Sequence, residues 1–170
     1  MSGGYLLATR ILENLCDDKR IKCLGALMKA EQGQAKLSSG DWNAALTLCM
    51  AAHDQFAGIP EAQPLLGIVK TDIAAAYGNL GRTYDSKRFA EDALPLLQGV
   101  TGLARTEAAA RMTAGVACYL DGDAVEGAKM FDGARQLLRG LPGAEEQLRI
   151  LESNEANLRA AGRKKWWKPW

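Results

Sequence analysis

The sequence predicts an all-α protein of about eight helices, arranged as an array of antiparallel helix pairs. Hydrophobic residues make up 48% and charged residues 24% of the 170 residues, which is the balance of a soluble globular domain. Ala, Leu and Gly are plentiful while β-branched residues are sparse, and this composition favours closely packed helices over a large sheet. Glycines recur at fixed intervals, since Gly40 follows Gly33, and Gly122 follows Gly115, at the same spacing. A different antiparallel helical array or bundle is the alternative.

The N-terminal part of the chain predicts three helices. An amphipathic helix is expected over residues 2–16 and a second helix over 21–37. The second helix ends before Gly40, because glycine readily adopts the positive φ that often terminates a helix. Asp41 can then cap a third helix over 42–56 by accepting hydrogen bonds from its free N–H groups.

The middle of the chain departs from this regular spacing. The repeat resemblance described below implies that Gly81 aligns with Gly33 and Gly115 as the glycine inside a first helix. The interval from Gly33 to Gly81 is then longer than the interval from Gly81 to Gly115 by about fourteen residues. We expect these extra residues over 60–72, as a longer loop and as an extension of a helix that ends at Asp85.

The second helix of this middle pair is the most irregular element. Its expected turn and start, residues 87–93, contain no glycine. Pro95 falls inside the helix, where a proline costs about 3 kcal/mol unless the helix kinks. Pro64, in contrast, suits the first turn of the extended helix before it.

The C-terminal part predicts one more pair and a cap. A first helix is expected over residues 101–120, a turn at Gly122, and a second helix that ends near Leu141. A charged helix over 144–161 would give the array the polar outer face that a terminal repeat needs. Residues 163–170 form a separate tail that is basic and rich in tryptophan.

Two stretches resemble the tetratricopeptide repeat (TPR). Residues 77–84 carry Tyr-x2-Leu-Gly-x2-Tyr, and residues 40–45 carry Gly-Asp-Trp-x2-Ala. The interval from Gly81 to Gly115 also matches the TPR period of about 34 residues. The resemblance implies a right-handed superhelical array in one domain, residues 1–162. It places the repeats at about 26–59, 74–107 and 108–141.

In the TPR family the first helices line a concave groove that binds peptides or partner helices. The contact residues that the resemblance implies here are Leu27, Leu37, Asn79, Arg82, Met112, Val116 and Tyr119. The resemblance also places Ala75, Gly78, Ser86 and Leu120 on the inward side. Some family members clamp a C-terminal carboxylate, but only Arg82 supplies an inward cation here, so a mostly apolar groove is expected. The expected function is a protein-interaction adaptor or small chaperone that binds an apolar or amphipathic segment of another protein. Ordinary inter-helix packing is the alternative role for each of these residues.

The tail suggests a second function. Trp166, Trp167 and Trp170 are candidate contact residues, and four cations accompany them in the last eight residues. A frayed end, docking on a protein surface or on a second copy, and stacking on single-stranded nucleic acid are open interpretations. The alternative to the adaptor is a peripheral membrane protein recruited through Trp and Lys at the membrane surface.

Other classes of function are disfavoured. Without those four cations the chain has 17 Lys and Arg against 20 Asp and Glu, a poor surface for nucleic acid. The four cysteines form no CxxC pair and the single histidine, His53, has no evident catalytic partner, so no metal, cofactor or enzyme activity is expected. Reduced thiols in the cytoplasm are the expected state of the cysteines.

Overall fold

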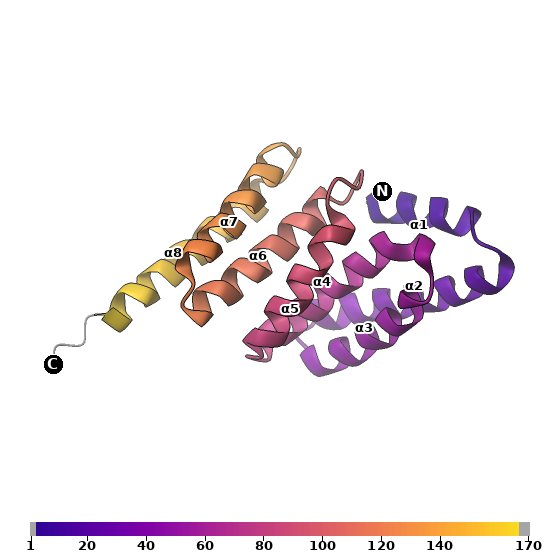
Figure 1. Ribbon diagram of the computed structural model, residues 1–170, viewed down its shortest axis with the longest axis horizontal. Helices are drawn as coiled ribbons and strands as arrows, with labels where there is room; N and C mark the ends of the chain where they lie inside the picture. The colour runs from indigo at the N-terminus through magenta and orange to yellow at the C-terminus, as the bar shows by residue number, and fades with distance from the viewer. Residues whose placement is uncertain (1–2, 167–170) are drawn as a thin grey trace.

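The computed structural model of the protein describes residues 3–166, and this range is helical with no strand. Figure 1 shows the helices side by side along the molecule, with α1, α2 and α3 at one end and α8 at the other. The prediction of an all-α array of about eight helices is confirmed. The α-helices are α1 (Gly3–Glu13), α2 (Asp17–Ser38), α3 (Trp42–Ala57), α4 (Gln63–Asn79), α5 (Thr83–Leu97), α6 (Ala104–Asp121), α7 (Ala124–Arg139) and α8 (Glu145–Trp166), with a 3-10 turn at Pro60–Ala62.

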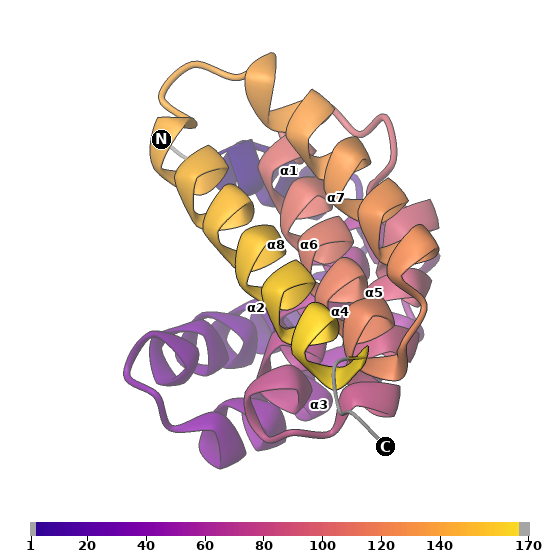
Figure 2. The ribbon, with the colours of Figure 1, turned by 90° about the vertical axis from the view of Figure 1, so that its left-hand side faces the viewer.

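Three antiparallel pairs, α2–α3, α4–α5 and α6–α7, make up most of the array. Each pair is joined by a short turn, and neighbouring pairs pack through α3 on α4 and α5 on α6. The first helices also contact one another across pairs, α2 with α4, α4 with α6, and α6 with α8. They therefore form one layer, and Figure 2 shows α8 beside α6 at the end of this layer. The handedness of the superhelix stays a prediction.

A constant repeat interval sets this geometry. The turns within the pairs carry Gly40, Gly81 and Gly122 at φ of 79°, 74° and 93°, a conformation that strains other residues. The spacing from Gly40 to Gly81 equals the spacing from Gly81 to Gly122, and we call this spacing the repeat interval. Asp41 and Asp123 then cap α3 and α7 by accepting from the N–H groups of Ala44 and Glu126, at 3.3 and 3.0 Å. The three second helices therefore begin one repeat interval apart, at residues 42, 83 and 124.

The predicted position of Gly81 inside a first helix is wrong. Gly81 lies in the turn, α4 ends at Asn79 instead of at Asp85, and α5 begins at Thr83 instead of within residues 87–93. The motif Leu-Gly-x2-Tyr fits the repeat with its glycine either inside the first helix or in the turn after it. Only the turn position requires a positive φ. Inside the first helices, Ala74 lies one repeat interval after Gly33 and one before Gly115. The middle pair therefore runs over 63–97, with no fourteen-residue insertion.

Other element boundaries also differ from prediction. α1, Gly3–Glu13, ends before the predicted end at residue 16. The first helix of the third pair, α6, begins at Ala104 instead of at residue 101. Pro64 lies in the first turn of α4, as predicted, and α5 continues through Pro95 to Leu97. The capping helix α8 extends to Trp166, so residues 163–166 of the predicted tail are helical. Trp167 and Trp170 lie outside the described residues, as does the side chain of Trp166.

Within each pair, side-chain sizes are matched where the two helices cross. Gly33 on α2 faces Cys49 on α3, because a Cβ on Gly33 would lie 2.4 Å from the Cys49 Sγ. Gly115 on α6 likewise faces Phe131 on α7, because a Cβ on Gly115 would lie 3.1 Å from the Phe131 ring. Cys49 and Phe131 are fully buried, at 0% exposure. A glycine in the first helix thus permits a larger residue opposite it.

α8 is attached to the last pair by a buried charge. Glu155 on α8 is 6% exposed and forms an ion pair with Arg135 of α7. Its other carboxylate oxygen accepts from Arg159, 2.6 Å away. Leu151 of α8 is fully buried in the same core cluster as Phe131 and Leu138 of α7. These contacts fix α8 beside α6, where it borders the first-helix layer.

Candidate functional site

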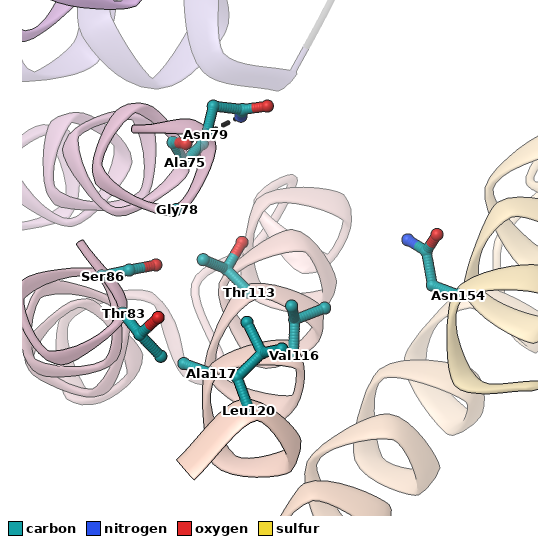
Figure 3. Close-up of a pocket in the computed structure, with 10 residues that line it drawn as sticks. All are labelled: Ala75, Gly78, Asn79, Thr83, Ser86, Thr113, Val116, Ala117, Leu120 and Asn154. Carbon is teal, nitrogen blue, oxygen red and sulfur yellow. Dashed lines mark hydrogen bonds between the residues drawn. The ribbon is translucent and has the colours of Figure 1, made fainter. Parts of the chain in front are cut away.

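A cavity of about 300 Å³ opens on the layer of first helices, between α4 and α8. Figure 3 shows α6 along the middle of this cavity, with Asn79 and Ala75 of α4 on one side and Asn154 of α8 on the other. The lining residues are Ala75, Gly78, Asn79, Thr83, Ser86, Thr113, Val116, Ala117, Leu120 and Asn154. None of these ten carries a charge.

Several polar side chains of the cavity already donate to backbone carbonyls. The Asn79 amide nitrogen donates to the Ala75 oxygen at 2.9 Å, and the Ser86 hydroxyl donates to the Ala74 oxygen at 2.8 Å. The Thr113 hydroxyl donates to the Ala109 oxygen at 3.0 Å. Their oxygens remain available as acceptors, so these groups suit a ligand that brings N–H donors.

Apolar side chains of α6 also line the cavity. Leu120 is 57% exposed, which is high for a leucine, and Val116 is half-buried beside it. Ala117, one turn of helix before Asp121, is small and buried. An exposed leucine next to less exposed apolar residues, bordered by uncharged polar groups, is typical of a site for an uncharged, partly apolar ligand.

The cavity brings together two of the predicted contact residues, Asn79 and Val116. Ala75, Gly78, Ser86 and Leu120, which the repeat resemblance also places on the inward side, line it as well. The other lining residues were missed. Thr113 and Asn154 are one repeat interval apart and so occupy equivalent positions on α6 and α8, a relation that the spacing of the turn glycines could have revealed.

Met112 and Tyr119, also predicted contacts, pack towards α7 and α8. Both are half-buried against the core cluster of these last helices. The Tyr119 ring lies 5.9 Å from the Phe131 ring, and its hydroxyl accepts from Arg159 Nε at 3.3 Å. These two side chains therefore pack in the core of the last helices instead of lining the cavity, because α8 occupies the space beside α6.

The remaining predicted residues lie apart from the cavity. Leu27 is half-buried against the core formed by α1 to α4, and Leu37 is half-buried near the end of α2. Arg82 is held in the turn after α4, with its guanidinium 4.4 Å from the centre of the Tyr77 ring. It also forms an ion pair with Asp85 at 2.7 Å. The cavity lining thus contains no cation that could clamp a carboxylate.

Asp72 continues the row of polar positions on the first helices. It precedes Thr113 by one repeat interval and Asn154 by two, so it takes the same place on α4. Asp72 is half-buried, and no hydrogen bond or ion pair of its carboxylate is found among the described residues. Burial raises the pKa of this carboxyl to about 7. The thiol of Cys49 interacts with this carboxylate. Burial, and then the charge of Asp72, raise the pKa of the Cys49 thiol to about 12.

Replacing Asp72 with Asn should make the protein more stable at pH 8. The pKa of Asp72 is higher in the folded protein, about 7, than the ordinary value of 3.8. The contribution of Asp72 to the stability of the folded protein is therefore fully present below about pH 4, and it is lost as the pH rises through about 7. At pH 8 we expect the Asn variant to be about 1–3 kcal/mol more stable, after a discount for the partial exposure of the site.

Thermal unfolding of both proteins at pH 5 and pH 8 measures this difference. The gain from Asp72→Asn should shrink between pH 8 and pH 5. Asp92→Asn is the control, because Asp92 is exposed and lies 3.5 Å from Lys70. An equal gain at both pH values would contradict a neutral, buried Asp72.

The described chain shows no metal site and no membrane span. No three side chains of His, Cys, Asp or Glu come together as metal ligands within residues 3–166. No helix in this range has the length and apolar character that crossing a membrane requires. Comparison with family models, curated proteins and solved structures finds no match for the chain. We therefore infer function from the helical array and its cavity.

Proposed function

We propose that the protein is a TPR-type interaction adaptor or small chaperone whose cavity binds a segment of another polypeptide. The segment is apolar or amphipathic, with one or two large apolar side chains against Val116 and Leu120. Its N–H groups face the acceptor oxygens of Asn79 and Thr113. This function belongs in the cytoplasm, because the four cysteines are free and three of them are buried, which suits a reducing compartment.

The observation that supports this proposal most is the exposed Leu120 in an uncharged cavity. A leucine that is 57% exposed costs solvation free energy in the free protein. Covering it with an apolar side chain recovers that free energy, and the helices around it are held in place by packing. A preformed site needs little ordering when it binds, so a few anchors can suffice for affinity.

Leu120→Glu should weaken the binding of an apolar segment at least tenfold. The probe is a peptide selected on the immobilised protein from a displayed library of random dodecapeptides, and its Kd is measured by calorimetry. The charge would lie in the cavity against the apolar side chains of the peptide. Folding should be unaffected, because Leu120 is exposed and lies one residue before the end of α6.

Val125→Glu is the matched control, because Val125 is 70% exposed on α7 and does not line the cavity. Removal of residues 167–170 is a second control, and it should leave the peptide Kd unchanged. An equal loss of affinity from Leu120→Glu and Val125→Glu would contradict binding in the cavity. Loss of affinity only on removal of the tail would favour the alternative in which Trp and Lys of the tail make the contact.

A further inference from the structure

One face of α2 is apolar and uncovered. Ile21, Leu24 and Met28 are 69%, 45% and 62% exposed. They are spaced at i, i+3 and i+7, so they form one stripe along the helix. We call these three residues the α2 stripe. The buried residues of α2, such as Cys23 and Ala26, point the other way, towards α3 and α4.

The repeat interval identifies the α2 stripe as a stacking face. The equivalent residues before and within α4 are Ala62, Leu65 and Val69, which are 0%, 3% and 1% exposed. At α6 the equivalents Leu103 and Ala110 are 1% and 0% exposed. In both places the second helix of the preceding pair packs against the following first helix. α2 has the same apolar face, but among the described residues only α1 comes before it.

α1 has the sequence pattern of the missing second helix. The buried residues Ala8 and Ile11 of α1, and Leu15 just after its end, lie one repeat interval before Cys49, Ala52 and Phe56, the buried residues of α3. The α2 stripe nevertheless stays exposed, because the buried side chains of α1 join the core cluster that Cys23 and Ala26 share with α3 and α4, on the other side of α2. Arg20 fixes this position by donating to the carbonyl oxygens of Leu12 and Leu15, at 3.0 and 2.8 Å.

The segment between α1 and α2 explains why α1 does not cover the stripe. After α3, α5 and α7 the chain passes through loops that contain Gly58, Gly99 and Gly140, each one repeat interval from the next. The equivalent residue before the first pair is Asp17, where α2 has already begun. α4 begins at Gln63, whose equivalent is Lys22, so α2 starts more than a turn earlier than the repeat would place it. With an extra turn of helix in place of the loop, α1 cannot fold back onto the stripe.

We propose that the α2 stripe pairs two copies of this chain, with α2 packed antiparallel against α2 of the second copy. A twofold axis near Leu24 would place Ile21 of one copy against Met28 of the other, so one surface is complementary to itself. α2 has 22 residues, and so offers a contact edge about 33 Å long. The other end of the array is a poorer partner for the stripe, because the exposed side of α8 includes Glu145, Glu146, Arg149 and Glu152.

Sedimentation velocity of the full chain over 1–200 µM tests the pairing. We expect a concentration-dependent dimer with twice the chain mass of 18.3 kDa. The double variant Ile21→Glu with Met28→Glu should weaken self-association at least tenfold and keep the far-UV circular dichroism of the wild type. Val125→Glu, a control of similar exposure on α7, should remain a dimer. A wild type that is monomeric over the whole range would overturn the proposal, as would a double variant that still dimerises.

A cross-linking experiment tests the orientation. Leu24→Cys in a Cys16→Ser background should give a disulfide-linked dimer on mild oxidation, because Leu24 lies near the axis. Val125→Cys in the same background should give at least tenfold less disulfide-linked dimer. Equal cross-linking of the two variants would contradict the proposed pairing. The α2 stripe does not line the cavity, so its variants should bind the selected peptide with unchanged Kd. The two proposals can therefore fail separately.

Discussion

Gly33→Ala should destabilise the protein by about 2 kcal/mol, a fall in Tm of roughly 4–8 °C, although alanine is the better helix former. The added Cβ would lie 2.4 Å from the Sγ of Cys49, which is fully buried. The steric cost therefore exceeds the gain of about 1 kcal/mol that Gly to Ala brings inside a helix. Thermal unfolding followed by circular dichroism measures the change.

Adding Cys49→Ala to this variant should restore most of the lost stability. The middle pair already has this combination, because Ala74 and Ala90 take the places of Gly33 and Cys49 and both are 0% exposed. The double-mutant cycle should therefore show a coupling energy of about 1–2 kcal/mol. Gly140→Ala is the control, since its Cβ would lie 3.6 Å from the nearest atom outside its neighbours. Additive losses in the cycle would show that the two residues do not face each other.

Glu155→Ala should loosen α8 and cost about 3 kcal/mol. The carboxylate of Glu155 is almost fully buried and joins α8 to Arg135 of α7. Removal leaves Arg135, which is 17% exposed in its side chain, with Asp132 as its remaining ion-pair partner. Because α8 supplies Asn154 to the cavity, peptide affinity should fall together with stability.

Hydrogen exchange of the α8 amides gives the sharper readout of this variant. Protection should fall in α8 before it falls in α4 or α5. Glu152→Ala is the control, because Glu152 is exposed on the same helix. Unchanged protection of α8 in Glu155→Ala would mean that Leu151 and its apolar neighbours hold the helix without the ion pair.

Much of the fold could be predicted from the sequence, because helix ends depend on local chemistry. Gly40, Asp41 and Gly122 mark their turns by backbone φ and capping alone, and the structure has both turns where they are predicted. The prediction misplaces the middle pair because one motif, Leu80-Gly81, fits the repeat at two positions seven residues apart. Equal intervals between Gly40, Gly81 and Gly122 resolve this ambiguity, whereas the shorter TPR period favours the wrong position.

The cavity could be predicted only in part. The repeat resemblance implies the inward positions of α4 and α6, so Asn79, Gly78 and Val116 could be assigned to the groove. The part formed by α8 could not, because the place where a capping helix packs depends on long-range contacts such as Glu155 with Arg135. The same contacts direct Tyr119 towards Arg159, which no spacing along the chain reveals.

The most direct test of the proposed function is methyl NMR of the protein titrated with the selected peptide. We predict that the largest shift changes occur at the methyl groups of Val116, Ala117 and Leu120, with amide changes at Asn79 and Asn154. Val125 on α7 and Met28 in the α2 stripe should change little. Shift changes confined to surfaces outside the cavity, with Val116 and Leu120 unaffected at saturation, would contradict peptide binding in the cavity.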